Sequence, residues 1–88
     1  MEELKKLREE IDRVDETLIR TLAMRFRITE KVGALKKAQK LSPVDPQREA
    51  EQEKRILELA KKAGLREDIA LSVLRLIIDT VVEDHKKA

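Results

Sequence analysis

Residues 4–36, LKKLREEIDRVDETLIRTLAMRFRITEKVGALK, decide the fold of this chain. Their apolar residues recur in alternating steps of three and four with one gap, which predicts a long helix with a coiled-coil-like seam. The seam consists of Leu4, Leu7, Ile11, Val14, Leu18, Ile28, Val32 and Leu35. In the gap the period falls on Thr21 and Arg25, so a guanidinium lies on a surface that should face another helix. Because a buried cation needs an anion, we expect Arg25 to bind one.

The composition indicates one small helical domain. Charged residues make up 43% of the 88 residues and apolar residues 41%, with a single aromatic residue, Phe26. This composition is typical of long-helix proteins rather than of sheets, and it predicts an all-α chain with one domain over residues 1–88. A hydrophobic core of this size is marginal unless oligomerisation or a ligand adds to it.

The same composition disfavours several classes of function. The net charge is only +2, its two signs are mixed along the chain, and aromatic residues that could stack on bases are lacking, so we expect no nucleic-acid partner. Without cysteine and with one histidine, the chain cannot form a thiolate or imidazole metal site, and we expect no cofactor. No run of about 18 apolar residues and no signal-type start occurs, which predicts a cytoplasmic chain without a membrane partner.

Two prolines and two capping signals divide the chain into three helices. The first helix should continue to about Lys40 and stop before the prolines. Asp45, followed by a proline, predicts the N-cap of a second helix over residues 46–63, and Gly64 is its expected C′ residue. After a short connection, residues 69–86 form a third helix that is apolar nearly all round and should be buried on several sides.

The length of the first helix predicts a dimer. A helix of about 35 residues is about 50 Å long, whereas a globular domain of this size spans roughly 25 to 30 Å. Its apolar stripes run along its whole length, so a second copy of the chain should cover the part beyond the other helices. We therefore expect an intertwined helical homodimer.

The helix geometry also predicts which cations share a ligand. Arg25 and Lys36 are eleven residues, or about 16 Å, apart on one face, which leaves room for a small multiply charged molecule between them. Arg8 is about 25 Å from Arg25, so it can serve the same pocket only from an antiparallel partner helix. Arg48 and Glu49, at the start of the second helix, could return over the Lys36 end.

Each of these residues also has an interpretation that involves no ligand. Arg8 could be a solvated charge paired with Asp12, and Arg25 could be a polar residue that sets the register of a coiled coil. Glu49 could simply favour a helix N-terminus, and His85 near the chain end would by default be exposed. The individual signals are therefore weak, and their combination carries the argument.

Together the motifs resemble the all-helical class of chorismate mutases, over residues 4–85. In order they are LREEIDRVD at 7–15, Arg25, Val32-Gly33 followed by Lys36, and DPQRE at 45–49. The resemblance implies an intertwined homodimer of three-helix chains, with two active sites that are each completed by an arginine from the partner subunit. This agrees with the dimer expected independently from the helix length.

The resemblance also implies a reaction, the rearrangement of chorismate to prephenate in aromatic amino acid biosynthesis. No proton moves in this pericyclic step and no covalent intermediate forms, so the chain needs neither a nucleophile nor a metal. By resemblance, Arg25 and the partner's Arg8 bind the two substrate carboxylates, Lys36 donates to the ether oxygen, and Glu49 accepts from the ring hydroxyl. The enzyme would act by holding a compact conformer and by stabilising the charge that grows on the ether oxygen.

The remaining implied site residues include two departures from the family pattern. Arg48 and the turn at Asp45 would shape and close the site. Val81 stands where a serine or asparagine usually contacts a substrate carboxylate, and it cannot hydrogen-bond. His85 stands where a glutamine usually supports Lys36, and an imidazole N–H could replace that donor. We expect these departures to affect catalytic efficiency more than the type of reaction.

Two other functions are compatible with the same fold. A lyase that cleaves isochorismate to pyruvate and salicylate shares the arginine and lysine frame, although residues 45–49 look more like those of a mutase. A catalytically silent dimerisation or regulatory module is the other alternative. The retained charged positions argue against it, because a pure coiled coil would gain by replacing Arg25 with an apolar residue.

Overall fold

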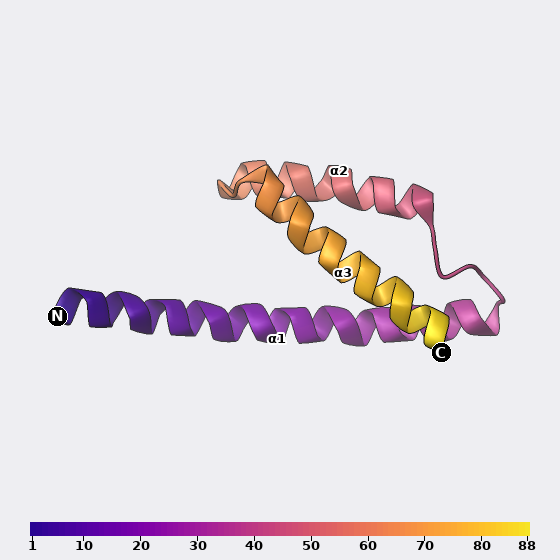
Figure 1. Ribbon diagram of the computed structural model, residues 1–88, viewed down its shortest axis with the longest axis horizontal. Coiled ribbons are helices and arrows are strands. Elements are labelled where there is room, and N and C mark those ends of the chain that lie inside the picture. Colours follow the sequence, from indigo (N-terminus) through magenta and orange to yellow (C-terminus); the bar gives the residue numbers. More distant parts are fainter. The chain divides into compact units, whose positions relative to one another are not determined.

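The computed structural model describes residues 1–88, and it consists of three helices joined by two short connections (Figure 1). The helices are α1 Glu2–Ala38, α2 Pro46–Ala63 and α3 Glu67–Lys87. The predicted all-α class is therefore confirmed. The chain forms two compact units, Met1–Lys31 and Val32–Ala88.

The helix α1 ends two residues earlier than predicted because of a backbone motif. The N–H of Leu41 donates to the carbonyl of Lys36 at 2.8 Å, and the N–H of Lys40 donates to the carbonyl of Lys37 at 3.2 Å. Lys40 has a φ of 58°, the left-handed conformation that closes a helix in a Schellman motif. A glycine usually occupies this position, so the sequence carried no signal for the helix end at Ala38.

Both ends of α2 follow the sequence prediction. Asp45 is the N-cap, and its Oδ1 accepts a hydrogen bond from the backbone N–H of Arg48 at 3.1 Å. Pro46 is the first helical residue, where its missing N–H is no loss. Gly64 closes the helix with a φ of 72° and donates its N–H to the carbonyls of Ala60 and Lys61.

The core of the second unit lies where α2 packs on α3. Its buried apolar side chains are Ala60, Ala70, Leu74 and Ile78. The predicted burial of α3 on several sides does not occur within one chain, since Val73 is 51% exposed and Leu76 69% exposed. The short connection before α3 gives that helix no side-chain cap, and it begins at Glu67 rather than at residue 69.

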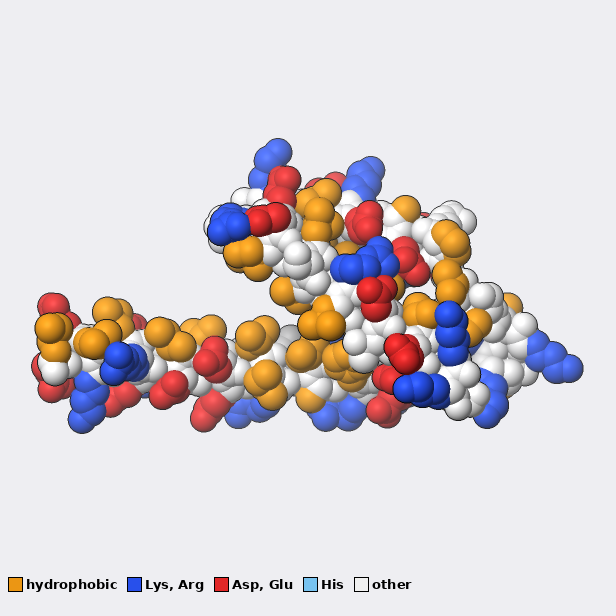
Figure 2. Space-filling model, viewed as in Figure 1, with side chains coloured by type: hydrophobic (Ala, Val, Ile, Leu, Met, Phe, Trp, Pro, Cys, Tyr) orange, Lys and Arg blue, Asp and Glu red, His pale blue; other side chains and the backbone are white.

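The first unit presents a row of exposed apolar side chains. Leu7, Ile11, Val14 and Leu18, at the helical spacing of the predicted seam, are all more than half exposed. Figure 2 shows hydrophobic side chains gathered along one edge of α1. None of the three helices contains an apolar stretch of the length that a bilayer crossing requires.

Candidate active site

Lys36 lies in the last turn of α1 and is half-buried beside the following loop. Its Nζ donates to the backbone carbonyl of Pro43 at 3.5 Å. The loop itself is held by the Ser42 hydroxyl, whose Oγ accepts from the N–H of Val44 at 3.1 Å. An ammonium has three N–H donors, so one long contact to a carbonyl leaves capacity to bind an anion.

The N-terminus of α2 carries three predicted site residues. Asp45 uses Oδ1 to cap the helix, which fixes the backbone of the turn before it. Arg48 is exposed and forms an ion pair with Glu51 at 3.6 Å, one turn further along the same helix. Glu49 is half-buried and contacts α3 instead of its own helix. Neighbouring residues of one helical turn therefore have different surroundings.

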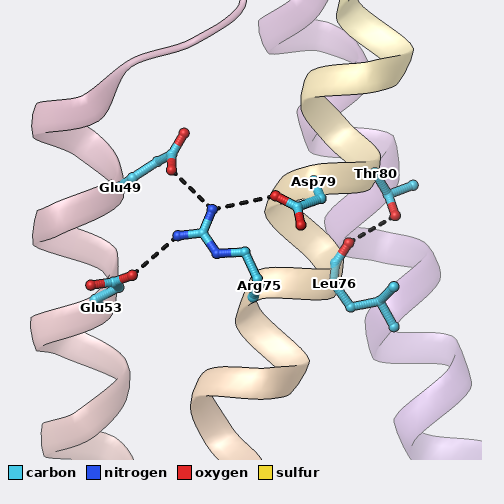
Figure 3. A network of polar contacts seen from close by, with 6 residues as sticks. All are labelled: Glu49, Glu53, Arg75, Leu76, Asp79 and Thr80. Carbon is cyan, nitrogen blue, oxygen red and sulfur yellow. Dashed lines mark hydrogen bonds and ion pairs between the residues drawn. The ribbon is translucent and has the colours of Figure 1, made fainter.

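Glu49 is bound by Arg75, a residue that sequence reasoning missed (Figure 3). Arg75 Nη1 donates to Glu49 Oε1 at 3.1 Å and to Asp79 Oδ1 at 3.3 Å, while its Nη2 donates to Glu53 Oε1 at 3.1 Å. These three carboxylates, Glu49 first, raise the pKa of the Arg75 guanidinium above its usual value. The sequence signal was limited to the four-residue spacing of Arg75 and Asp79, because the other partners belong to α2.

Val81 and His85 lie one turn apart on α3 and are both half-buried. The imidazole of His85 lies against the backbone of α1 at Gly33, where an added Cβ would be 2.6 Å from Cδ2 and 2.7 Å from Nε2. Gly33 is one helical turn before Lys36, so His85 approaches the helix segment that carries the predicted catalytic lysine. The interpretation of His85 as an exposed terminal residue is wrong.

A groove of about 610 Å³ opens between the loop, the start of α2 and the end of α3. It is lined by Val44, Glu49, Asp79, Val82, Glu83, Lys86 and Lys87. Three carboxylates and two ammonium groups therefore face one concave surface, and Glu49 is the predicted site residue among them.

The two remaining predicted residues belong to the first unit. Arg8 is exposed and Arg25 is half-buried, and both are carried by α1. Arg8 follows Leu7 directly in α1, so it lies beside the exposed apolar row rather than in it. Lys36, Asp45, Arg48, Glu49, Val81 and His85 all belong to the second unit.

Comparison with known proteins identifies the family. Residues 7–86 match the family described as chorismate mutase type II. A bifunctional chorismate mutase/prephenate dehydratase of Aquifex aeolicus is 36% identical over 90 residues, which cover 99% of this chain and 25% of that protein. The T-protein of Haemophilus influenzae is 43% identical over 76 residues, which cover 85% of this chain and 20% of that protein.

The chain thus spans a quarter or less of the length of these curated relatives. The family match nevertheless covers nearly all of the chain, from the first predicted site residue, Arg8, to the last, His85. It agrees with the resemblance found in the sequence motifs, and it confirms the predicted family. The chain belongs to the type II chorismate mutase family.

Proposed function

We propose that this chain converts chorismate to prephenate in the cytoplasm, as a step in aromatic amino acid biosynthesis. The observation that carries the proposal is the family match over residues 7–86, which includes all eight predicted site positions. The reaction breaks the C–O bond to the enolpyruvyl group and forms a C–C bond, while electrons move around a cyclic transition state. Neither a proton nor a leaving group is transferred to the protein.

The protein's task in such a step is to orient and to stabilise charge. Chorismate is a dianion that must adopt a compact conformer before its ends can react, and binding both carboxylates achieves this. Arg25 would bind one carboxylate and Arg8 of the partner subunit the other. The exposed apolar row on α1 supports this part of the proposal, because a second copy that covers the row would bring its own arginine to the site.

Lys36 would stabilise the negative charge that develops on the ether oxygen. Its ammonium is half-buried and makes one long contact to the Pro43 carbonyl, which an anionic oxygen would readily replace. His85 supports the same oxygen in this proposal, since its ring lies against the α1 backbone one turn from Lys36. A donor that is already in place when the charge appears lowers the barrier without reorganisation.

Glu49 would accept a hydrogen bond from the ring hydroxyl, and Arg48 with the Asp45 turn would close the site. Val81 supplies only an apolar wall where related enzymes place a hydrogen-bonding side chain. Substrate binding would therefore depend more heavily on the two arginines than in those relatives.

The test is to follow the loss of chorismate absorbance at several protein concentrations and to identify the product. We expect prephenate to form at a rate proportional to the dimer concentration. A parallel incubation with isochorismate separates the lyase, which would release pyruvate and salicylate. Turnover of isochorismate alone would establish the lyase, and turnover of neither substrate by folded protein would establish a silent module.

A further inference from the structure

We propose that Arg75 is a positioning residue that holds the Glu49 carboxylate for the hydroxyl of the substrate. The inference rests on the proposed function of Glu49 and adds a residue on a different helix. Arg75 itself would not touch the substrate. It would act through the hydrogen bond from its Nη1 to Glu49 Oε1 (Figure 3).

The arrangement of α2 explains why Glu49 needs such a partner. Glu49 and Glu53 are four residues apart on α2, and like charges at this spacing repel each other. Arg75 donates to the first with Nη1 and to the second with Nη2, both at 3.1 Å. The planar guanidinium is thereby fixed by two carboxylates at once, which a flexible lysine ammonium would not achieve.

Burial makes the contact with Glu49 the strongest of the three. The side chain of Glu49 is 22% exposed, compared with 48% for Glu53 and 65% for Asp79. Solvent screens exposed ion pairs more than partly buried ones, so the outer two carboxylates contribute less. Of the three carboxylates, Glu49 is therefore the one that Arg75 restrains most, while Glu53 and Asp79 add weaker contacts to the same guanidinium.

The hydrogen bond from Arg75 leaves Glu49 able to accept a second hydrogen bond from a substrate hydroxyl. Only its Oε1 is engaged by Arg75, so Oε2 can accept a hydrogen bond from a hydroxyl. The ion pair also restrains a side chain that would otherwise sample many rotamers, and it offsets the repulsion between this carboxylate and a dianionic substrate. Glu49 also lines the groove between the loop, α2 and α3, where a ligand has access to it.

The inference is tested by a double-mutant cycle in the full 88-residue chain. Because a hydroxyl acceptor binds ground state and transition state alike, Arg75→Gln should raise KM for chorismate about tenfold and change kcat less than about threefold. In a Glu49→Gln background the same substitution should change KM less than about twofold. Arg75→Lys, which keeps the charge, should restore part of the loss.

The matched control is Arg66→Gln. Arg66 is an exposed arginine of the segment before α3 that pairs with Asp68 at 2.6 Å, outside the groove and the Glu49 cluster. This variant should keep the kinetic constants of the parent. Circular dichroism checks whether each variant is folded. If Arg75→Gln is unfolded, Arg75→Lys replaces it in the double-mutant cycle, with a smaller expected rise in KM.

Distinct results would overturn the inference. An equal rise in KM with and without Glu49 would show that Arg75 acts on the fold instead, and an unchanged or lowered KM would show that Arg75 does not position Glu49. If the parent converts chorismate but the Arg75 variants behave like the control, this inference alone fails. If the folded parent converts no chorismate, the proposed function fails and the inference with it.

Discussion

Replacement of Gly33 by alanine tests the approach of His85 to α1. In a helix interior, alanine is favoured over glycine by about 1 kcal/mol, so the substitution should stabilise a helix that is not packed against anything. At Gly33, however, the new Cβ would be 2.6 Å from Cδ2 and 2.7 Å from Nε2 of His85. Carbon atoms in ordinary contact are about 3.5 to 4.0 Å apart, so the overlap is about 1 Å.

The gain in helix propensity and the overlap with His85 oppose each other, so their relative sizes decide whether Gly33→Ala raises or lowers the free energy of unfolding. Overpacking of this kind costs about 1–3 kcal/mol, which exceeds the gain in helix propensity. Gly33→Ala should therefore lower the free energy of unfolding by up to about 2 kcal/mol. In a His85→Ala background the overlap is gone, and the same substitution should raise the free energy of unfolding by about 1 kcal/mol.

The assay is urea unfolding followed by circular dichroism, at one fixed protein concentration because association contributes to stability. Gly64→Ala provides the contrast. No atom lies within 4 Å of a Cβ added at Gly64, but the φ of 72° is unfavourable for alanine. Gly64→Ala should therefore lower the free energy of unfolding by about 1 kcal/mol whether or not His85 is present. A Gly33→Ala effect of the same sign and size in both backgrounds would refute the contact.

Four further outcomes follow from the proposed site. An Arg8→Ala chain mixed with an Arg25→Ala chain should regain activity once subunits exchange, because one of the two sites then has both arginines; an inactive mixture with confirmed exchange would contradict the shared site. Lys36→Ala should lower kcat by about two orders of magnitude or more with a smaller change in KM, whereas a near-normal kcat would exclude its role at the ether oxygen. His85→Ala should lower kcat, and His85→Gln, which supplies the donor usual in the family, should keep most of it; an unchanged kcat in His85→Ala would place His85 outside the site. Sedimentation at micromolar concentration should show only dimer, and a stable folded monomer would contradict an obligate assembly.

Local signals in the sequence predicted local structure well. Asp45 caps α2 with its own carboxylate and Gly64 closes it in a left-handed conformation, and both effects depend on residues within one turn. Lys40 takes the same left-handed conformation at the end of α1 without being a glycine. Its conformation follows from hydrogen bonds of the backbone, which every residue can make. The residue type at position 40 therefore gave no basis for predicting the end of α1.

Contacts between helices were less accessible to sequence reasoning. The spacing of Arg75 and Asp79 indicates a pair within α3, but the bond to Glu49 requires the register between α2 and α3. The position of His85 likewise depends on a missing side chain at Gly33, which in the sequence is only an unfavourable residue inside a helix. Glycine inside a helical pattern has a packing reason here, and only the structure shows which side chain supplies it.

The small core of a single chain links assembly to catalysis. Of its four buried apolar residues two are alanines, Ala60 and Ala70, and no large side chain is completely enclosed. Apolar area outside this core remains exposed, notably along the row of α1 that contains Leu7 and Ile11. In the proposed dimer that area is covered by the partner, which supplies hydrophobic stabilisation that one chain lacks. Because Arg8 lies beside this row on α1, the association that completes the core would also deliver the last cation of the active site.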